Sequence, residues 1–202
     1  MEAALRAGIA LHDAGHYHGA HDAWEDAWLD ETGDDERLLH GLIQCSAAVH
    51  HARNRNWEGA TGVAASARDY LGALPSDYRG VNVAAVDAYL AVLVRDPEVV
   101  ERRPPVEITY RGATPSFADL APPAAVRAAA VVAVEEGFDD ETFAHAAAYA
   151  RDGLDGGELN DYGAFLCDFL VEPENRALIA ERLGQRVSRR RARERDVEGL
   201  FD

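Results

Sequence analysis

The sequence contains no lysine, and its basic side chains other than histidine are 20 arginines. They face 36 aspartate and glutamate residues, which gives a formal net charge of −16 at pH 7. Self-repulsion of this size destabilises a compact state in dilute salt, but molar salt screens it because the Debye length falls to about 3 Å. A high-GC genome also favours arginine over lysine, yet it does not explain the acid excess. The composition is typical of halophilic proteins, and we expect the melting temperature to rise from low salt to multimolar KCl.

Cysteine is nearly absent, and no long hydrophobic run occurs. Cys45 and Cys167 lie in apolar helical contexts, where free thiols behave as small hydrophobic residues rather than as a disulfide framework. The longest apolar segment, near residues 124–134, is interrupted by Arg127 and is too short to span a bilayer. No basic region followed by an apolar run marks an export signal. We therefore expect a soluble, cytoplasmic protein without a membrane segment.

Apolar residues recur with helical spacing through most of the chain, which predicts an all-α protein. We expect a compact antiparallel helical bundle over residues 1–103, followed by a second, smaller helical unit over residues 104–202. The boundary is placed at Arg102-Arg103-Pro104-Pro105, because two prolines cannot continue a helix. The expected helices of the first unit are residues 3–14, 17–29, about 34–53, 57–74 and 82–93. The second unit starts with a strand-like stretch, 106–110, and then has helices expected over 124–136, 139–152, 159–171 and 174–194.

Histidine is concentrated at one end of the chain, with seven of the eight histidines among the first 51 residues. Residues three and four apart share a face of a helix, so His18, His21 and Glu25 can converge on one point. Asp22 stands beside them. Imidazole and carboxylate groups of one helix, joined by a residue of the next helix, would make the mixed nitrogen and oxygen site that zinc, iron or manganese occupies.

These residues lead to a specific hypothesis for a divalent-metal centre between the second and third helices. His21, Glu25 and His50 are the candidate ligands. Gln44 would orient a ligand or substrate, and Asp22 would act as a general base that activates water. Such a centre favours a hydrolytic reaction.

The same residues also fit a structural role. His21 lies on the apolar stripe of its helix with Trp24 and Trp28, where a buried histidine bonded to Glu25 or Gln44 would satisfy a polar pair inside the core. The protein would then be a non-enzymatic helical binding or adaptor module. Four further histidines are expected to be solvated on helix faces: His12, His16, His40 and His51.

One run of residues resembles a known family. It reads Gly15-His-Tyr-His-Gly-Ala-His-Asp-Ala-Trp-Glu-Asp-Ala-Trp28 and is followed by Gly41-Leu-Ile-Gln44 and His50. Over about residues 5–75 the chain resembles the domain of unknown function 309 family, which implies a compact α-helical bundle of bacterial or archaeal origin and no particular reaction. The acidic composition suggests a halophilic archaeal member with a C-terminal helical extension. The motif positions of the family correspond to His21, Trp24, Glu25, Gln44 and His50. Asp22 replaces the usual glutamate, which keeps a carboxylate but shortens its reach.

Arginines cluster near the C-terminus of this otherwise acidic chain, at Arg186, Arg189, Arg190, Arg191, Arg193 and Arg195. Acidic residues interleave with them, so we expect intramolecular or intersubunit ion pairs. The overall negative charge disfavours nucleic acid as a partner. The pattern leaves a homo-oligomer open.

Overall fold

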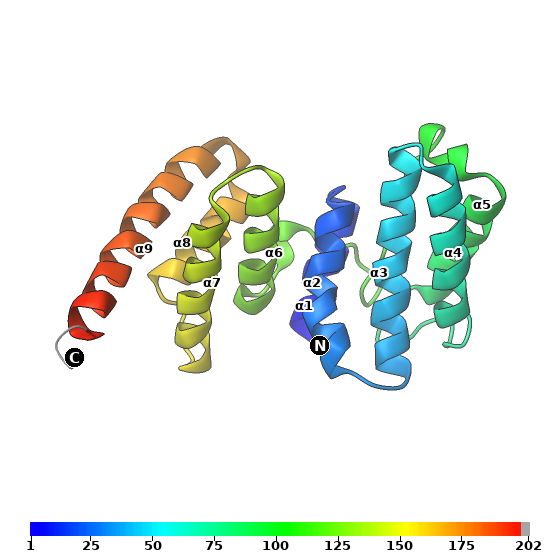
Figure 1. Ribbon diagram of the computed structural model, residues 1–202. Coiled ribbons are helices and arrows are strands. Elements are labelled where there is room, and N and C mark those ends of the chain that lie inside the picture. Colours follow the sequence, from blue (N-terminus) through cyan, green and yellow to red (C-terminus); the bar gives the residue numbers. More distant parts are fainter. Residues whose placement is uncertain (199–202) are drawn as a thin grey trace. The chain divides into compact units, whose positions relative to one another are not determined.

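The computed structural model describes residues 1–198, and α-helices form most of it (Figure 1). The α-helices are α1 (Glu2–Asp13), α2 (Tyr17–Asp30), α3 (Asp34–Arg53), α4 (Trp57–Leu71), α5 (Val83–Arg95), α6 (Pro122–Glu135), α7 (Asp140–Asp155), α8 (Asp161–Val171) and α9 (Arg176–Glu198). Three short 3-10 helices are η1 (Pro97–Glu101), η2 (Phe117–Asp119) and η3 (Pro173–Asn175). No strand occurs among residues 1–198, which confirms the all-α prediction.

The chain divides into two compact units, Met1–Leu120 and a second unit that begins at Ala121. Residues 104–120, which the sequence pattern placed in the second unit, belong by their contacts to the first. Within the described chain, no helix is both long and apolar enough to cross a membrane.

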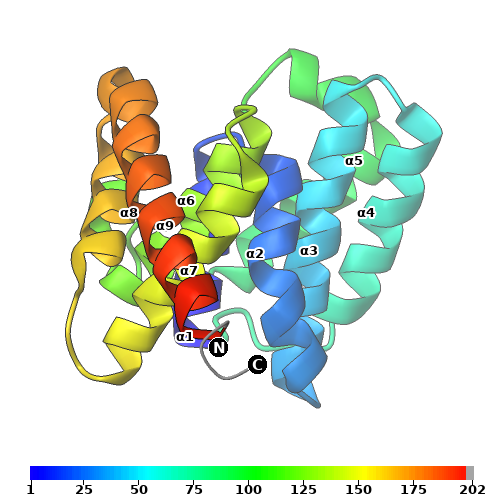
Figure 2. The same ribbon diagram turned by 60° about the vertical axis from the view of Figure 1, so that its left-hand side comes forward.

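The first unit is a series of helices in which each of α1 to α4 contacts the next along the chain. Figures 1 and 2 show α2, α3 and α4 side by side. The connections at 31–33 and 54–56 are short, so neighbouring helices run in opposite directions. The central helix, α3, buries the stripe expected from its spacing, which consists of Leu38, Leu42, Cys45 and Val49. These side chains hold α3 in the middle of the bundle and fix which of its faces points outward.

The strand-like segment 106–110 does not form a strand. Tyr110 makes isolated bridges with Val81 and Ala113, and no ladder extends from them. The prediction failed because the segment has the β-branched and aromatic residues of a strand, but no extended partner lies beside it.

Side chains of neighbouring elements hold the backbone of this segment instead. Nε2 of His12 lies 3.2 Å from the carbonyl oxygen of Val106. The amide of Ile108 donates to the Asp13 carboxylate at 3.0 Å. Asn82, just before α5, accepts from the amide of Thr109 at 2.9 Å and donates to the carbonyl of Glu107 at 3.0 Å. The backbone polar groups are therefore satisfied without a sheet.

The second unit packs α6, α7 and α8 against one another, with α9 against α7 and α8. Three phenylalanines form its aromatic core, namely Phe138, Phe143 and Phe169, with ring centroids 4.7 to 6.1 Å apart.

The arginines of α9 pair within this unit, as predicted. Arg190 lies over the Tyr149 ring at 3.7 Å and pairs with Glu194 at 2.9 Å. Arg191 pairs with Glu141 at 2.5 Å, and Arg186 pairs with Asp161. Much of the basic cluster is thus engaged by the acidic residues of the same chain.

Candidate functional site

Helix α2 carries the predicted site and is held in place by Trp24. This side chain is fully buried, and its indole N–H donates to the carbonyl of Leu5 on α1 at 3.2 Å. Gly8 allows the close approach, because a Cβ at that position would lie 2.2 Å from the indole ring. The Trp24 side of α2 therefore faces α1. His21 and Glu25 lie on the outer side of α2.

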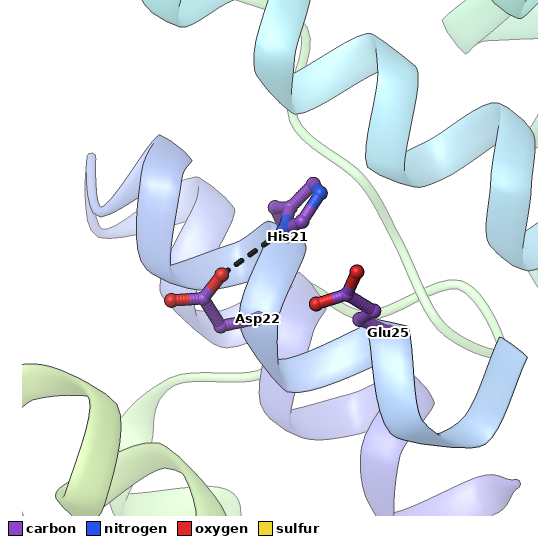
Figure 3. Close-up of side chains that lie close together, drawn as sticks. All are labelled: His21, Asp22 and Glu25. Atoms are coloured by element: carbon purple, nitrogen blue, oxygen red, sulfur yellow. Dashed lines mark hydrogen bonds and ion pairs between the residues drawn. The ribbon is translucent and has the colours of Figure 1, made fainter. Parts of the chain in front are cut away.

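His21, Asp22 and Glu25 lie together on α2 (Figure 3). Each offers one ligand atom, and these three atoms lie within 4.8 Å of one another. Nδ1 of His21 is 2.9 Å from Oδ1 of Asp22, so the imidazole and the carboxylate already face each other. His21 is half-buried and both carboxylates are exposed. Of the groups expected to converge, His21 and Glu25 thus lie together with Asp22 on a single helix, and His18 is not one of these three.

His50 is not part of that group, but it lines a cavity that His21 also lines. A cavity of about 300 Å³ between α2 and α3 is lined by Tyr17, His18, His21, Ala47, His50 and His51. The ring centroids of His18 and His50 are 5.7 Å apart, and those of His18 and His21 are 6.3 Å apart. Two imidazoles bound to one zinc ion have centroids about 5 Å apart, given Zn–N bonds of about 2.0 Å. His18 is not among the predicted ligands. Its ring thus lies near both of the predicted histidine ligands.

Gln44 has a partner on its own helix, α3, and His50 has one in Asn54, the C-cap residue of that helix. The Gln44 amide lies 2.9 Å from Nε2 of His40, and Asn54 donates to Nε2 of His50 at 3.0 Å. Gln44 also lines a second cavity that His21 borders. Gln44 and His21 therefore border the same cavity.

Residues 5–63 match the family described as "Domain of unknown function (DUF309)". This segment resembles DUF309. The DUF309 segment spans α2 and α3 completely and includes His21, Glu25, Gln44 and His50. No curated protein matches the chain. The family description names no reaction, so roles for these residues are inferred from their geometry alone.

A further polar group in the DUF309 segment was missed. His12 is 1 % exposed, so the expectation that it is solvated is wrong. Its Nδ1 lies 2.7 Å from the Ser46 hydroxyl, and its Nε2 faces the Val106 carbonyl. The ring is therefore neutral, with Nε2–H donating to the carbonyl and the Ser46 hydroxyl donating to Nδ1. Burial lowers the pKa of His12 to about 4.

The signal that could have revealed His12 is its position. Leu5, Ile9 and His12 occupy one face of α1 at helical spacing, and both apolar members are buried. A histidine in that register points inward with its neighbours.

Asp13 lies next to His12 and borders a cavity of about 580 Å³. The walls of this cleft come from the ends of α1 and α3 and from residues 104–107. The pKa of Asp13 is raised to about 7, mainly by burial; the hydrogen bond from the Ile108 amide opposes this rise, and the nearby Glu107 adds to it. One carboxyl oxygen, Oδ2, is buried without a hydrogen-bond partner. Residues 104–107 lie outside the DUF309 segment, so this cleft depends on both parts of the unit.

Proposed function

We propose that the protein binds a divalent transition metal on the outer face of α2, through His21 and Glu25. The observation that carries this proposal is the group of three ligand atoms, from His21, Asp22 and Glu25, that lie within 4.8 Å of one another. His18 and His50 border the adjoining cavity, and either would add a third protein ligand by rotating toward the same ion. One imidazole with carboxylates suits zinc, iron or manganese.

The proposed activity of this centre is hydrolysis. A site whose first ligands come from one helix leaves coordination positions open, and open positions distinguish catalytic from structural metal sites. A bound metal would supply a Lewis acid and lower the pKa of water. Asp22 would accept the proton of the water, and Gln44, which borders the cavity next to His21, would orient the substrate.

A second candidate is a non-enzymatic helical binding or adaptor module. It is supported by the partners of Gln44 and His50, which are His40 on α3 and Asn54 at the C-cap of α3. In that case the polar groups of α3 serve to order the helix surface, and the group on α2 is a solvated face.

Metal binding is tested on full-length protein without a histidine tag, by elemental analysis and by calorimetric titration with Zn²⁺ and Mn²⁺. We expect one equivalent of metal, at least about tenfold weaker binding in His21→Ala, and a smaller loss in Glu25→Gln. His145→Ala is the matched control, because His145 faces one carboxylate, Glu141, at 3.7 Å on α7. Substoichiometric binding in the parent protein, or equal losses in His21→Ala and His145→Ala, would reject the metal site.

Hydrolysis is tested separately with bis-p-nitrophenyl phosphate and p-nitrophenyl acetate on the metal-loaded protein. We expect Asp22→Asn to retain the metal and to lose most of the turnover. A protein that binds metal stoichiometrically but hydrolyses neither compound would favour the binding module over the enzyme.

A further inference from the structure

A second cavity of the first unit lies across three helices. It measures about 440 Å³ and is lined by His21, Trp28, His40, Ile43, Gln44, Ala47, Gly62, Val63 and Ser66. The α3 residues recur at positions 40, 43, 44 and 47, which is one continuous face of that helix. The cavity therefore depends on the regular packing of α2, α3 and α4 rather than on a loop.

The lining of this cavity differs in composition from the rest of the chain. None of its nine residues is aspartate, glutamate or arginine, although the chain has 36 acidic residues and a net charge of −16. Burial lowers the pKa of His40, which keeps that imidazole neutral. Ile43, Ala47 and Val63 contribute apolar surface. A charged molecule would lose its hydration here without gaining an opposite charge, so the cavity suits an uncharged ligand.

Two lining residues each have a buried polar atom without a hydrogen-bond partner. They are Nε1 of Trp28, which is a donor, and Oε1 of Gln44, which is an acceptor. The other end of the Gln44 amide is occupied by His40. Buried polar atoms are nearly always paired, so a donor and an acceptor without partners on two side chains that line one cavity favour a ligand with the complementary pair, which would reach them once these side chains turn toward the cavity.

The aromatic rings at this site favour a planar ligand. His40 lies between Trp28 and Tyr70, with ring centroids 4.6 Å and 4.1 Å away. These rings are tilted by 46° and 32° to one another rather than stacked, and aromatic rings in such clusters bind other flat rings by offset or edge contacts.

We propose that this cavity binds a small, uncharged, planar amide or lactam, whose carbonyl accepts from Trp28 and whose N–H donates to Gln44. The proposal goes beyond the metal site and does not depend on it, although His21 borders both. A cyclic amide with an aromatic or heteroaromatic ring satisfies both open atoms at once and stacks on the rings beside them. The remaining polar side chain, Ser66, adds a hydroxyl at the α4 wall.

Gly62 provides a way to close the cavity without disturbing the fold. A Cβ at this position meets no heavy atom within 4 Å, so Gly62→Leu projects its side chain into open space. Leucine also has a higher helix propensity than glycine, so the variant should be at least as stable as the parent. Ala65→Leu is the matched control, because it adds the same side chain to an exposed position of α4 outside the cavity.

The probe is benzamide, titrated into full-length protein in EDTA, so that the result is independent of any metal. Binding is followed by the indole N–H signals in ¹⁵N NMR spectra. The chain has three tryptophans, so Trp28→Phe assigns the Trp28 signal and Trp57 serves as an internal reference. We expect saturable binding with a dissociation constant of about 1 mM or tighter, and a shift of the Trp28 signal that Trp57 does not share.

The variants and a second compound complete the test. Trp28→Phe keeps an aromatic ring but removes the donor, so affinity should fall about tenfold. Gly62→Leu should abolish binding, whereas Ala65→Leu should match the parent. Benzoate, which is charged and lacks the N–H, should bind at least about tenfold more weakly than benzamide. Absence of saturable benzamide binding, equal affinity for benzoate, or unchanged affinity in Gly62→Leu would each overturn the proposal, whatever the outcome of the metal titration.

Discussion

The two units of the chain differ in whether their buried polar side-chain atoms all have hydrogen-bond partners. Five buried side-chain atoms of the first unit have no hydrogen-bond partner, and they belong to Arg6, Asp13, Trp28, Gln44 and Tyr89. Over residues 121–197 of the second unit there is no such atom. Its half-buried Arg176, for example, donates to the carbonyls of Phe169 and Leu170 and pairs with Glu136.

The difference indicates where binding chemistry is located. Buried donors and acceptors without a hydrogen-bond partner lower the stability of the fold unless a ligand supplies the partner. In the first unit such atoms belong to residues that line cavities, namely Asp13, Trp28 and Gln44. The same unit holds seven of the eight histidines. We infer that the first unit binds ligands and that the second is stabilised by its own satisfied ion pairs and aromatic core.

The largest effect is expected from removing the core anchor of each unit. Trp24→Ala should cost about 3–5 kcal/mol in the free energy of unfolding, because it leaves a large cavity against Gly8. Phe169→Ala should cost a similar amount in the second unit. Urea denaturation measures both. Only Trp24→Ala should also weaken metal and benzamide binding under native conditions. Equal losses of binding in both variants would show that the two units do not function separately.

The next effect concerns acid stability and the buried His12. Its pKa in the folded state, about 4, lies below the value of 6.5 expected in the unfolded chain. The folded state therefore favours the neutral ring, and this contribution is complete above pH 6.5 and is lost as the pH falls toward 4. Its full size is about 3 kcal/mol.

Urea denaturation at pH 7.5, 5.5 and 4.5 in constant high salt measures this dependence. His12→Gln cannot titrate, so its stability should fall less steeply than that of the parent over this range. Parallel slopes would mean that His12 is not responsible for the acid sensitivity.

Asp13 should act in the opposite direction. Its folded-state pKa, about 7, lies above the unfolded value of 3.8, so the folded state favours the protonated carboxyl and loses stability as the pH rises from 4 through 7. Asp13→Asn retains an acceptor for the Ile108 amide and removes the charge. We expect it to be more stable than the parent at pH 8 by about 1–2 kcal/mol, after allowance for partial solvent exposure, and equal to it near pH 4. Thermal melts at the two pH values compare the proteins.

The smallest effect is expected from removing a surface arginine of the second unit that has an ion pair and a ring contact. Arg190→Ala removes a stacking contact with Tyr149 and an ion pair with Glu194, which together are worth about 1 kcal/mol. Arg190→Lys should recover only part of this, because lysine keeps the charge but not the planar group. Arg189→Ala, an exposed neighbour on α9, should leave the melting temperature unchanged. A loss at Arg189 as large as that at Arg190 would contradict the role given to these pairs.

Helix positions could be predicted from local patterns because most of the fold consists of regular, amphipathic helices. Helix α2 was expected over 17–29 and runs from Tyr17 to Asp30, while α4 was expected to reach Leu74 and ends at Leu71. The amide of the C-cap residue Gly72 donates to the Arg68 carbonyl and ends α4 before Leu74. The exact end depends on this local hydrogen bond, which apolar spacing does not reveal.

The candidate site was predictable only where it depends on one helix. The grouping of His21 with Glu25 follows from their i,i+4 spacing. The meeting of His12 with Ser46, or of Trp28 with His40, depends on how α1, α2 and α3 pack, and no local pattern contains that information. Open polar atoms such as Oε1 of Gln44 emerge only after every other partner has been assigned in three dimensions.

The side chains that hold residues 106–109 have a consequence for local dynamics. The amides of Ile108 and Thr109 belong to no helix or strand, yet Asp13 and Asn82 accept from them. Hydrogen exchange at these two amides should therefore be slow within an otherwise rapidly exchanging connection. Their exchange rates would report the opening of α1 and of the start of α5, so two loop protons can serve as sensors of the stability of the first unit.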